Sequence, residues 1–245
     1  MDKLNNRTHV FISTFLILSG FFIISISLWD STIGNSIEAV EQERISKDIF
    51  TSNVVIRDID NADSYMTIEE PTSESDRVAA VSDEPALADK PEYGEVFAKL
   101  YVPRFGEDYV RVIAEGTSSG VLNKAVGHYV TSALPWDEGN FALAAHRTTR
   151  GASFLNIDKL VDGDKSIVET VDAYYVYEYV NTVVVSPNES SVLLDFPPQF
   201  EGNAVGSILT FTSCHPKYSS AERIVAFSVL VGVYDKDSYA LEDIL

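Results

Sequence analysis

The strongest constraint on the fold comes from the C-terminal part of the chain, about 150 residues that carry many strand signals and few helical ones. The expected strands are rich in Val, Ile, Tyr, Phe and Thr. They cover residues 98–102, 109–114, 140–147, 166–170, 173–185, 192–195, 207–214 and 223–234. Two short helices are expected around 122–124 and 152–160. Short strands at this spacing, separated by turn signals, predict a closed barrel or a sandwich.

The N-terminal part carries a long uncharged stretch at residues 10–29. Roughly twenty apolar residues are needed to cross a bilayer as a helix. Lys3 and Arg7 precede the stretch and acidic residues follow it, which places residues 1–9 in the cytoplasm and the rest outside. A cleaved signal peptide is the alternative, but the apolar core is longer than usual and lacks a clear cleavage site. We therefore predict a single-pass transmembrane anchor.

Residues 30–95 form an acid-rich stretch with few large apolar side chains, in a chain whose net charge is −19. Such a stretch buries too little surface to offset its ordering entropy, so we predict an extracytoplasmic linker, partly helical or disordered. Residues 96–245 are predicted to form one compact domain with its own core. The missing Lys/Arg clusters argue against nucleic acid as a partner. Scattered carboxylates lack an oxygen-ligand loop, and we predict no metal and no cofactor.

Cys214 is the only cysteine. An unpaired thiol in an exported protein is more readily explained by reactivity than by packing, because exported thiols usually pair. Alternation along the strand 207–214 places Cys214 on one face with Thr210 and Thr212. Leu209 and Phe211 fall on the other face. The sequence thus predicts a nucleophilic cysteine on the more polar face of a strand.

A nucleophilic cysteine needs a nearby base or cation, because the thiolate reacts and an ordinary thiol titrates near about 8.5. His9 lies at the membrane boundary, and His215 points to the face opposite Cys214. His128 is expected in a turn or loop, where it is either structural or lines the substrate site. His146, near the end of the strand 140–147, is the best candidate.

An acyl-transfer site must also stabilise negative charge on the tetrahedral oxygen, and a guanidinium suits this task. A hairpin through 215–220 would return Arg223 to the side of Cys214. A solvent-exposed arginine at a strand end explains the spacing equally well. Three other arginines are alternatives: Arg104, Arg147 and Arg150.

Several motifs occur together in one order along residues 97–234. They are YVPRFG at 101–106, GHY at 127–129, GNFA at 139–142, HRTTRG at 146–151 and LTFTSCHPKYS at 209–219, followed by Arg223. In this combination the segment resembles the catalytic domain of a sortase, most closely a class E sortase of high-GC Gram-positive bacteria. Each motif alone would be weak evidence for this family, whereas the whole set in this order is specific for it.

The resemblance implies an eight-stranded sortase-type β-barrel with short helices and a catalytic set of His146, Cys214 and Arg223. It implies a transpeptidase that cleaves a C-terminal sorting motif, Leu-Ala-x-Thr-Gly or Leu-Pro-x-Thr-Gly, between Thr and Gly. The partners would be secreted proteins with such signals, a peptidoglycan precursor or other cell-wall amine, and the membrane. Substrate-binding residues are expected at Tyr129, Thr212 and Ser213.

Two positions depart from the family pattern: Ala145 replaces the usual glycine before the histidine, and Ser213 stands where threonine is common. Neither departure removes a catalytic group, but both are expected to affect substrate preference. A pilin-polymerising sortase is the nearest rival, but residues 91–94 match its lid motif poorly. An L,D-transpeptidase lacks its pattern around Cys214, and a non-enzymatic membrane-tethered β-domain would leave this thiol inert.

Overall fold

The computed structural model describes residues 12, 14–19, 35–50, 53–57, 65–69, 90–202 and 206–244. Most of the predicted anchor at 10–29, all of residues 1–9 and much of the predicted linker lie outside these residues. Among the described residues, no helix is both long and apolar enough to cross a membrane.

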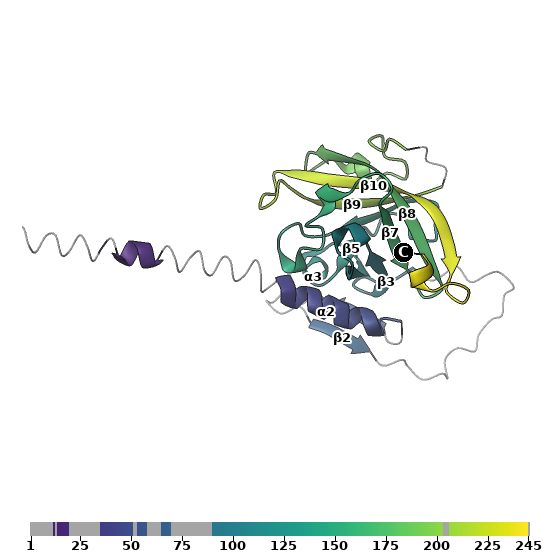
Figure 1. Ribbon diagram of the computed structural model, residues 1–245, viewed down its shortest axis with the longest axis horizontal. Helices are drawn as coiled ribbons and strands as arrows, with labels where there is room; N and C mark the ends of the chain where they lie inside the picture. Colours follow the sequence, from purple (N-terminus) through teal and green to yellow (C-terminus); the bar gives the residue numbers. More distant parts are fainter. Residues whose placement is uncertain are drawn as a thin grey trace, which may run out of the picture.

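Eight strands close into one barrel with the order β10-β8-β7-β3-β4-β5-β6-β9 (Figure 1). The strands are β3 (Val96–Tyr101), β4 (Val110–Glu115), β5 (Val126–His128), β6 (Gly139–Ala144), β7 (Lys165–Glu169), β8 (Ala173–Val185), β9 (Ser207–His215) and β10 (Glu222–Asp235). Neighbouring strands are antiparallel except for the pairs β4–β5 and β6–β9. The predicted eight-stranded barrel is confirmed.

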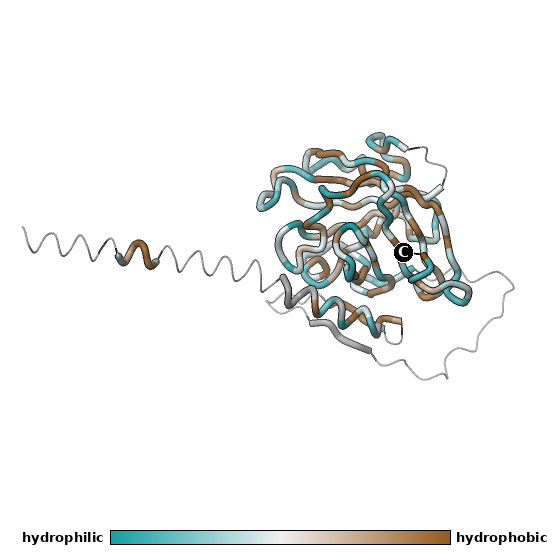
Figure 2. Tube along the Cα trace, viewed as in Figure 1, coloured by the Kyte–Doolittle hydropathy of each residue, from teal (hydrophilic) through white to brown (hydrophobic). Residues whose placement is uncertain are grey.

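The barrel interior is filled by alternate residues of the strands. Figure 2 shows that apolar and polar residues are mixed along the same strands. Leu209 and Phe211 of β9 lie in this main core, as the period of two predicted. Phe154, from the loop after β6, packs on Phe211 with ring centroids 4.7 Å apart. The core therefore ties the loop that follows His146 to the strand that carries Cys214.

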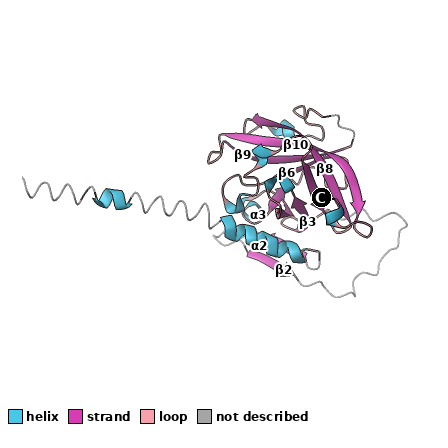
Figure 3. Ribbon diagram, in the orientation of Figure 1, coloured by secondary structure: helices cyan, strands magenta, loops and turns pink. Residues whose placement is uncertain are grey.

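Short helices surround the barrel rather than form a layer of their own (Figure 3). They are η3 (Pro103–Phe105), α3 (Ser119–Leu122), η4 (Arg150–Ala152), η5 (Ile157–Lys159), η6 (Ser190–Leu193) and η7 (Leu241–Asp243). The helix expected at 122–124 is α3, which starts earlier because the Ser118 hydroxyl caps the backbone N–H of Val121 at 3.4 Å. The helix expected at 152–160 is instead two separate 3₁₀ turns, η4 and η5.

Three strand predictions were wrong in detail. Residues 192–195 do not form a strand: η6 covers this region, and the side-chain amide of Asn140 binds the carbonyls of Val192 and Leu194 at 3.0 and 2.9 Å. The strand expected at 140–147 ends at Ala144. The backbone N–H of Phe154 binds the carbonyl of His146 at 3.1 Å, which turns the chain back.

The third error concerns β5, which was expected to be a turn or loop around His128. The strand has three residues, and its central residue is Gly127, which weakens a strand pattern. A Cβ atom at Gly127 would lie 2.4 Å from the carbonyl oxygen of Gly116, so the neighbouring backbone leaves room only for glycine. Gly127, which weakened the strand pattern in the sequence, is thus required by the packing of β5 against the neighbouring backbone.

Part of the acidic segment before the barrel is folded onto it. Helix α2 (Asn35–Asp48) and strand β2 (Tyr65–Glu69) lie along the lower side of the barrel in Figure 1, and β2 pairs with strand β1 (Asn53–Arg57). Helix α2 and strand β1 pack on the barrel. Their apolar side chains form one buried cluster with β3, β4 and α3: Ile45, Ile49, Val54, Ile56, Val96, Val112, Ala114, Val121 and Ala125. Gly94, at φ +85°, lets β1 approach, because a Cβ there would lie 2.1 Å from the Ile56 carbonyl oxygen.

The end of α2 is also fixed by charge. The ring of Phe50 lies 4.5 Å from the Lys99 ammonium and 4.1 Å from the Lys236 ammonium. Both lysines pair with the buried carboxylate of Glu169, at 3.4 and 2.6 Å. The carboxylate compensates the two cations, which keeps them in place on the faces of the aromatic ring.

These contacts predict that the segment before residue 90 stabilises the barrel. A protein that begins at residue 90 is expected to unfold at least about 5 °C below one that begins at residue 30, because 1 kcal/mol shifts the midpoint by about 2–4 °C at this size. Thermal unfolding followed by circular dichroism measures the difference. In the longer protein, Ile56→Ala should lower the free energy of unfolding by about 2–5 kcal/mol. Equal midpoints for the two proteins would mean that the cluster adds no net stability.

Candidate active site

Cys214 lies near the end of β9, directly opposite Arg223 at the start of β10. Directly opposed residues of an antiparallel pair point to the same face of the sheet. Cys214 and Arg223 therefore share one face, together with Thr212 and Val225 of the next like-facing pair. The thiol is free and half-buried. The hairpin predicted from spacing alone does bring the arginine beside the cysteine.

His146 is the second residue beyond the end of β6, where the chain still runs beside β9. The backbone N–H of Ala145 binds the carbonyl of Thr212 at 3.2 Å, and the hydroxyl of Ser213 binds the carbonyl of Ala145 at 2.7 Å. This continues the parallel register of β6 and β9, in which Ala144 is opposite Thr212. The next positions of that register bring His146 level with Cys214.

The imidazole of His146 is not committed to another role. Its Nε2 is buried and has no hydrogen-bond partner among the described residues. Burial, and to a lesser degree the charge of Arg150, lowers the pKa of His146 below its ordinary value. The neutral imidazole is therefore favoured at neutral pH, and it is ready to exchange a proton with a group that enters the site.

The structure distinguishes Arg223 from two of the other arginines that were candidates for oxyanion stabilisation. Its Nη1 binds the carbonyls of Ser220 and Glu222 at 3.2 and 3.0 Å, and among the described residues its Nε and Nη2 donate no hydrogen bond. Arg104 forms an ion pair with Asp164 at 2.7 Å. Arg147 is buried within the protein framework. Arg223 thus keeps donors for an incoming oxygen on the face of Cys214.

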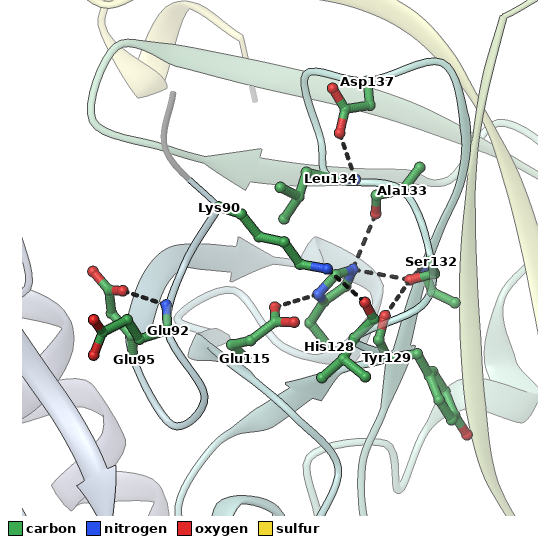
Figure 4. Close-up of polar contacts among 12 residues, drawn as sticks. Lys90, Glu92, Glu95, Glu115, His128, Tyr129, Ser132, Ala133, Leu134 and Asp137 are labelled. Carbon is green, nitrogen blue, oxygen red and sulfur yellow. Dashed lines mark hydrogen bonds and ion pairs between the residues drawn. The ribbon is translucent and has the colours of Figure 1, made fainter. Parts of the chain in front are cut away.

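His128 is occupied in a buried polar cluster (Figure 4). Its side chain is 0% exposed, and its Nδ1 lies 2.5 Å from a carboxylate oxygen of Glu115. Its Nε2 faces the carbonyl of Ala133 at 3.0 Å and the hydroxyl of Ser132 at 2.9 Å. Both ring nitrogens therefore already have hydrogen-bond partners among neighbouring groups. His128 has no free nitrogen to act as a base.

Two of the three predicted substrate-binding residues contact each other. The hydroxyls of Tyr129 and Thr212 lie 2.9 Å apart, which joins the end of β5 to β9 two residues before the cysteine. Ser213 faces inward and is buried. Its hydroxyl donates to the backbone carbonyl of Ala145, so the two departures from the family pattern contact each other. The roles of these residues in substrate binding stay predictions.

Sequence reasoning missed two members of the framework around the site. Glu115 carried no signal because it is an acidic residue at the end of a strand, and only the barrel places it opposite His128. Arg147 was considered only as an alternative to Arg223, although its side chain reaches the carbonyl of Cys214 at 3.3 Å. Within the described residues, no group of three or more His, Cys, Asp or Glu is arranged to hold a metal ion.

Comparisons with known proteins place this arrangement in a family context. The sortase domain family matches residues 100–231. Sortase SrtE1 of Streptomyces coelicolor is 40% identical over 148 residues, which cover 57% of this chain and 42% of that protein. The chain spans 42% to 58% of the length of the curated relatives it matches.

Two solved structures share the barrel. Sortase E from Streptomyces avermitilis superposes with a TM-score of 0.58 at 29% identity, covering 63% of this chain and 99% of that one. Sortase E1 from Streptomyces coelicolor, solved with a tripeptide in the active site, gives a TM-score of 0.57 at 35% identity, covering 61% of this chain and 96% of that one.

Proposed function

This chain belongs to the sortase family, and we propose that it is a class E-like cysteine transpeptidase in which Cys214, His146 and Arg223 carry the reaction. The observation that carries the proposal is the pairing of Cys214 with Arg223 on one face, with the uncommitted imidazole of His146 level with the cysteine on the neighbouring segment. These are the three kinds of group that acyl transfer through a thiol requires: a nucleophile, an acid/base and an oxyanion donor.

In the acylation step, the neutral imidazole of His146 takes the proton of the Cys214 thiol, and the resulting thiolate attacks the threonine carbonyl of a Thr-Gly bond in the substrate. The carbonyl oxygen takes the electron pair and becomes an oxyanion. The tetrahedral intermediate then collapses, the C–N bond breaks, and the leaving glycine amine takes a proton from protonated His146. A thioester between the threonine and Cys214 remains, and His146 is neutral.

In the transfer step, a cell-wall amine attacks the thioester carbonyl. His146 accepts a proton from this amine, the C–S bond breaks, and the new amide leaves with the acceptor. Cys214 returns as a thiolate beside a protonated imidazole. The imidazole then returns its proton to the thiolate, so His146 ends each cycle neutral, as it began.

Arg223 stabilises both tetrahedral intermediates. Its Nε and Nη2 can donate to the oxyanion, and its permanent charge offsets the negative charge that develops there. The Nη1 bonds to Ser220 and Glu222 hold the guanidinium against the hairpin, so the donors are fixed before the substrate arrives.

The test is direct. The full chain, purified in detergent, is mixed with a fluorogenic Leu-Ala-x-Thr-Gly peptide and a glycine-based amine acceptor, and the products are read by mass spectrometry. We expect a thioester adduct on Cys214, cleavage between Thr and Gly, and a product joined to the acceptor. A parallel Leu-Pro-x-Thr-Gly peptide tests the class E preference, for which faster turnover of the alanine peptide is expected.

Replacing Arg223 by lysine tests the oxyanion role. Lysine keeps the charge but loses the planar set of donors, so we expect kcat/KM for the peptide to fall about 10²-fold. Arg104→Lys, at an exposed ion pair with Asp164, is the matched control and should stay within about twofold of wild type. Near wild-type activity for Arg223→Lys would remove Arg223 from the reaction.

The location of the enzyme is part of the proposal. Residues 10–29 would anchor the chain in the membrane, with residues 1–9 in the cytoplasm and the barrel outside. The substrates would be secreted proteins with C-terminal sorting signals, and the acceptor a peptidoglycan precursor or another cell-wall amine. The apolar composition of 10–29 and the order of charges around it support this arrangement.

The rival functions differ in measurable ways. A pilin-polymerising sortase would use a lysine side chain of another pilin subunit as its acceptor, so it would not transfer the peptide to the glycine-based amine. A non-enzymatic membrane-tethered β-domain would leave Cys214 unreactive to iodoacetamide at neutral pH.

A further inference from the structure

We propose that Arg147 is a positioning residue that fixes the backbone of the nucleophile Cys214 relative to His146. The inference rests on the proposed function, because it assigns a role within the same reaction. It concerns a side chain that lies in the framework behind the site and has no part in the chemical steps described above.

Arg147 makes three contacts although its side chain is only 2% exposed. Its Nη1 donates to the carbonyl of Cys214 at 3.3 Å, and its Nε donates to the carbonyl of Leu155 at 3.2 Å. Its Nη2 forms an ion pair with Asp158 at 3.0 Å. One side chain thus links the nucleophile strand to the loop 153–160.

The contact with Cys214 replaces a backbone hydrogen bond that would be present if the ladder between β6 and β9 continued. The backbone N–H of Ala145 binds the carbonyl of Thr212, and in a continued parallel ladder the N–H of residue 147 would bind the carbonyl of Cys214. The strand has already ended at Ala144, so the guanidinium of Arg147 supplies the donor instead. His146 lies between these two attachment points, and its position relative to Cys214 depends on both.

The ion pair explains why the guanidinium stays in place. Lys217, on the hairpin after Cys214, also contacts Asp158 at 3.5 Å. Burial raises the pKa of Asp158, but the charges of Arg147 and Lys217 together with hydrogen bonds outweigh it, and the net pKa lies below its ordinary value. The carboxylate is therefore ionised at neutral pH, and it anchors Arg147 on one side and the hairpin on the other.

The test compares Arg147→Met, Arg147→Lys and Asp158→Asn in the full chain with the Leu-Ala-x-Thr-Gly peptide. Reactive thiols are counted by iodoacetamide labelling, so that kcat refers to correctly folded sites. We expect kcat of Arg147→Met to fall about 10- to 100-fold with KM nearly unchanged, since small misplacements of reacting groups cost this much. Arg147→Lys should recover part of the loss, because an ammonium can hold one of the three contacts.

Arg104→Met is the matched control, because Arg104 also pairs with an aspartate but contacts neither Cys214 nor His146. Its kcat should stay within about twofold of wild type. If Arg147→Met fails to fold, Asp158→Asn decides, since the Asp158 side chain is 41% exposed and its replacement removes only the anchor. A several-fold loss of kcat is expected there.

Two results would overturn the inference. One is a wild-type kcat per reactive thiol in Arg147→Met or, if that variant does not fold, in Asp158→Asn, which would leave Arg147 with a role in stability alone. The other is an equal loss in Arg104→Met. A wild-type protein that fails to cleave the peptide would instead refute the proposed function. In that case, the rate at which iodoacetamide labels Cys214 tests the positioning role. This rate should be at least about threefold slower in Arg147→Met than in wild type and Arg104→Met.

Discussion

Cys214→Ala is expected to abolish both cleavage and transfer of the sorting peptide, with a loss of at least about 10⁴-fold in kcat/KM. The reaction requires a covalent thioester, and no other cysteine exists in the chain to form one. No adduct of the peptide mass should appear on the variant in mass spectrometry under conditions where the wild type is labelled.

The loss should come without a change in the fold. Cys214 makes no disulfide and its side chain is half-buried, so removing the sulfur leaves only a small gap. The thermal midpoint of Cys214→Ala is therefore expected within a few degrees of wild type. If the variant cleaved the peptide at an undiminished rate, the thiol would have no part in the reaction and the mechanism would have to be abandoned.

The second large effect is expected at the histidines, for which we propose different tasks. His146→Ala should lower kcat about 10²- to 10⁴-fold, the range typical of losing a general acid/base, while the thermal midpoint changes little. Its Nε2 has no partner among the described residues, so replacement breaks no hydrogen bond from that atom.

His128→Ala is the matched counterpart and should behave in the opposite way. It leaves the Glu115 side chain buried without its partner, and breaking such a buried pair costs about 3–5 kcal/mol. At about 2–4 °C per kcal/mol, the midpoint should fall by about 6–20 °C. The kcat per reactive thiol should stay much closer to wild type. An active His146→Ala protein beside a stable but inactive His128→Ala protein would reverse the two assignments.

Much of the barrel could be predicted from local pattern, because strands such as β8 and β10 are long and rich in β-branched and aromatic residues. The failures have physical causes. Strand β5 has three residues and a glycine that backbone packing requires. Residues 192–195 have strand-like composition, but the amide of Asn140, distant in sequence, holds their carbonyls in another geometry.

For the site, spacing predicted the pairing of Cys214 with Arg223, because a short hairpin fixes which residues of its two strands face each other. The choice between His128 and His146 rested on weaker grounds. Composition does not reveal that Glu115 occupies one nitrogen of His128, since the two residues meet only through the parallel pairing of β4 with β5.

The amino-acid sequence by itself determined the β-rich class and the family and singled out Cys214 as the candidate nucleophile, because these depend on local composition and on an ordered set of motifs. Only the tertiary structure decided which histidine is free, that part of the acidic segment packs on the barrel, and that Arg147 holds the backbone of Cys214. Each of these depends on contacts between residues far apart along the chain, and the closed barrel sets those contacts through the order and register of its strands.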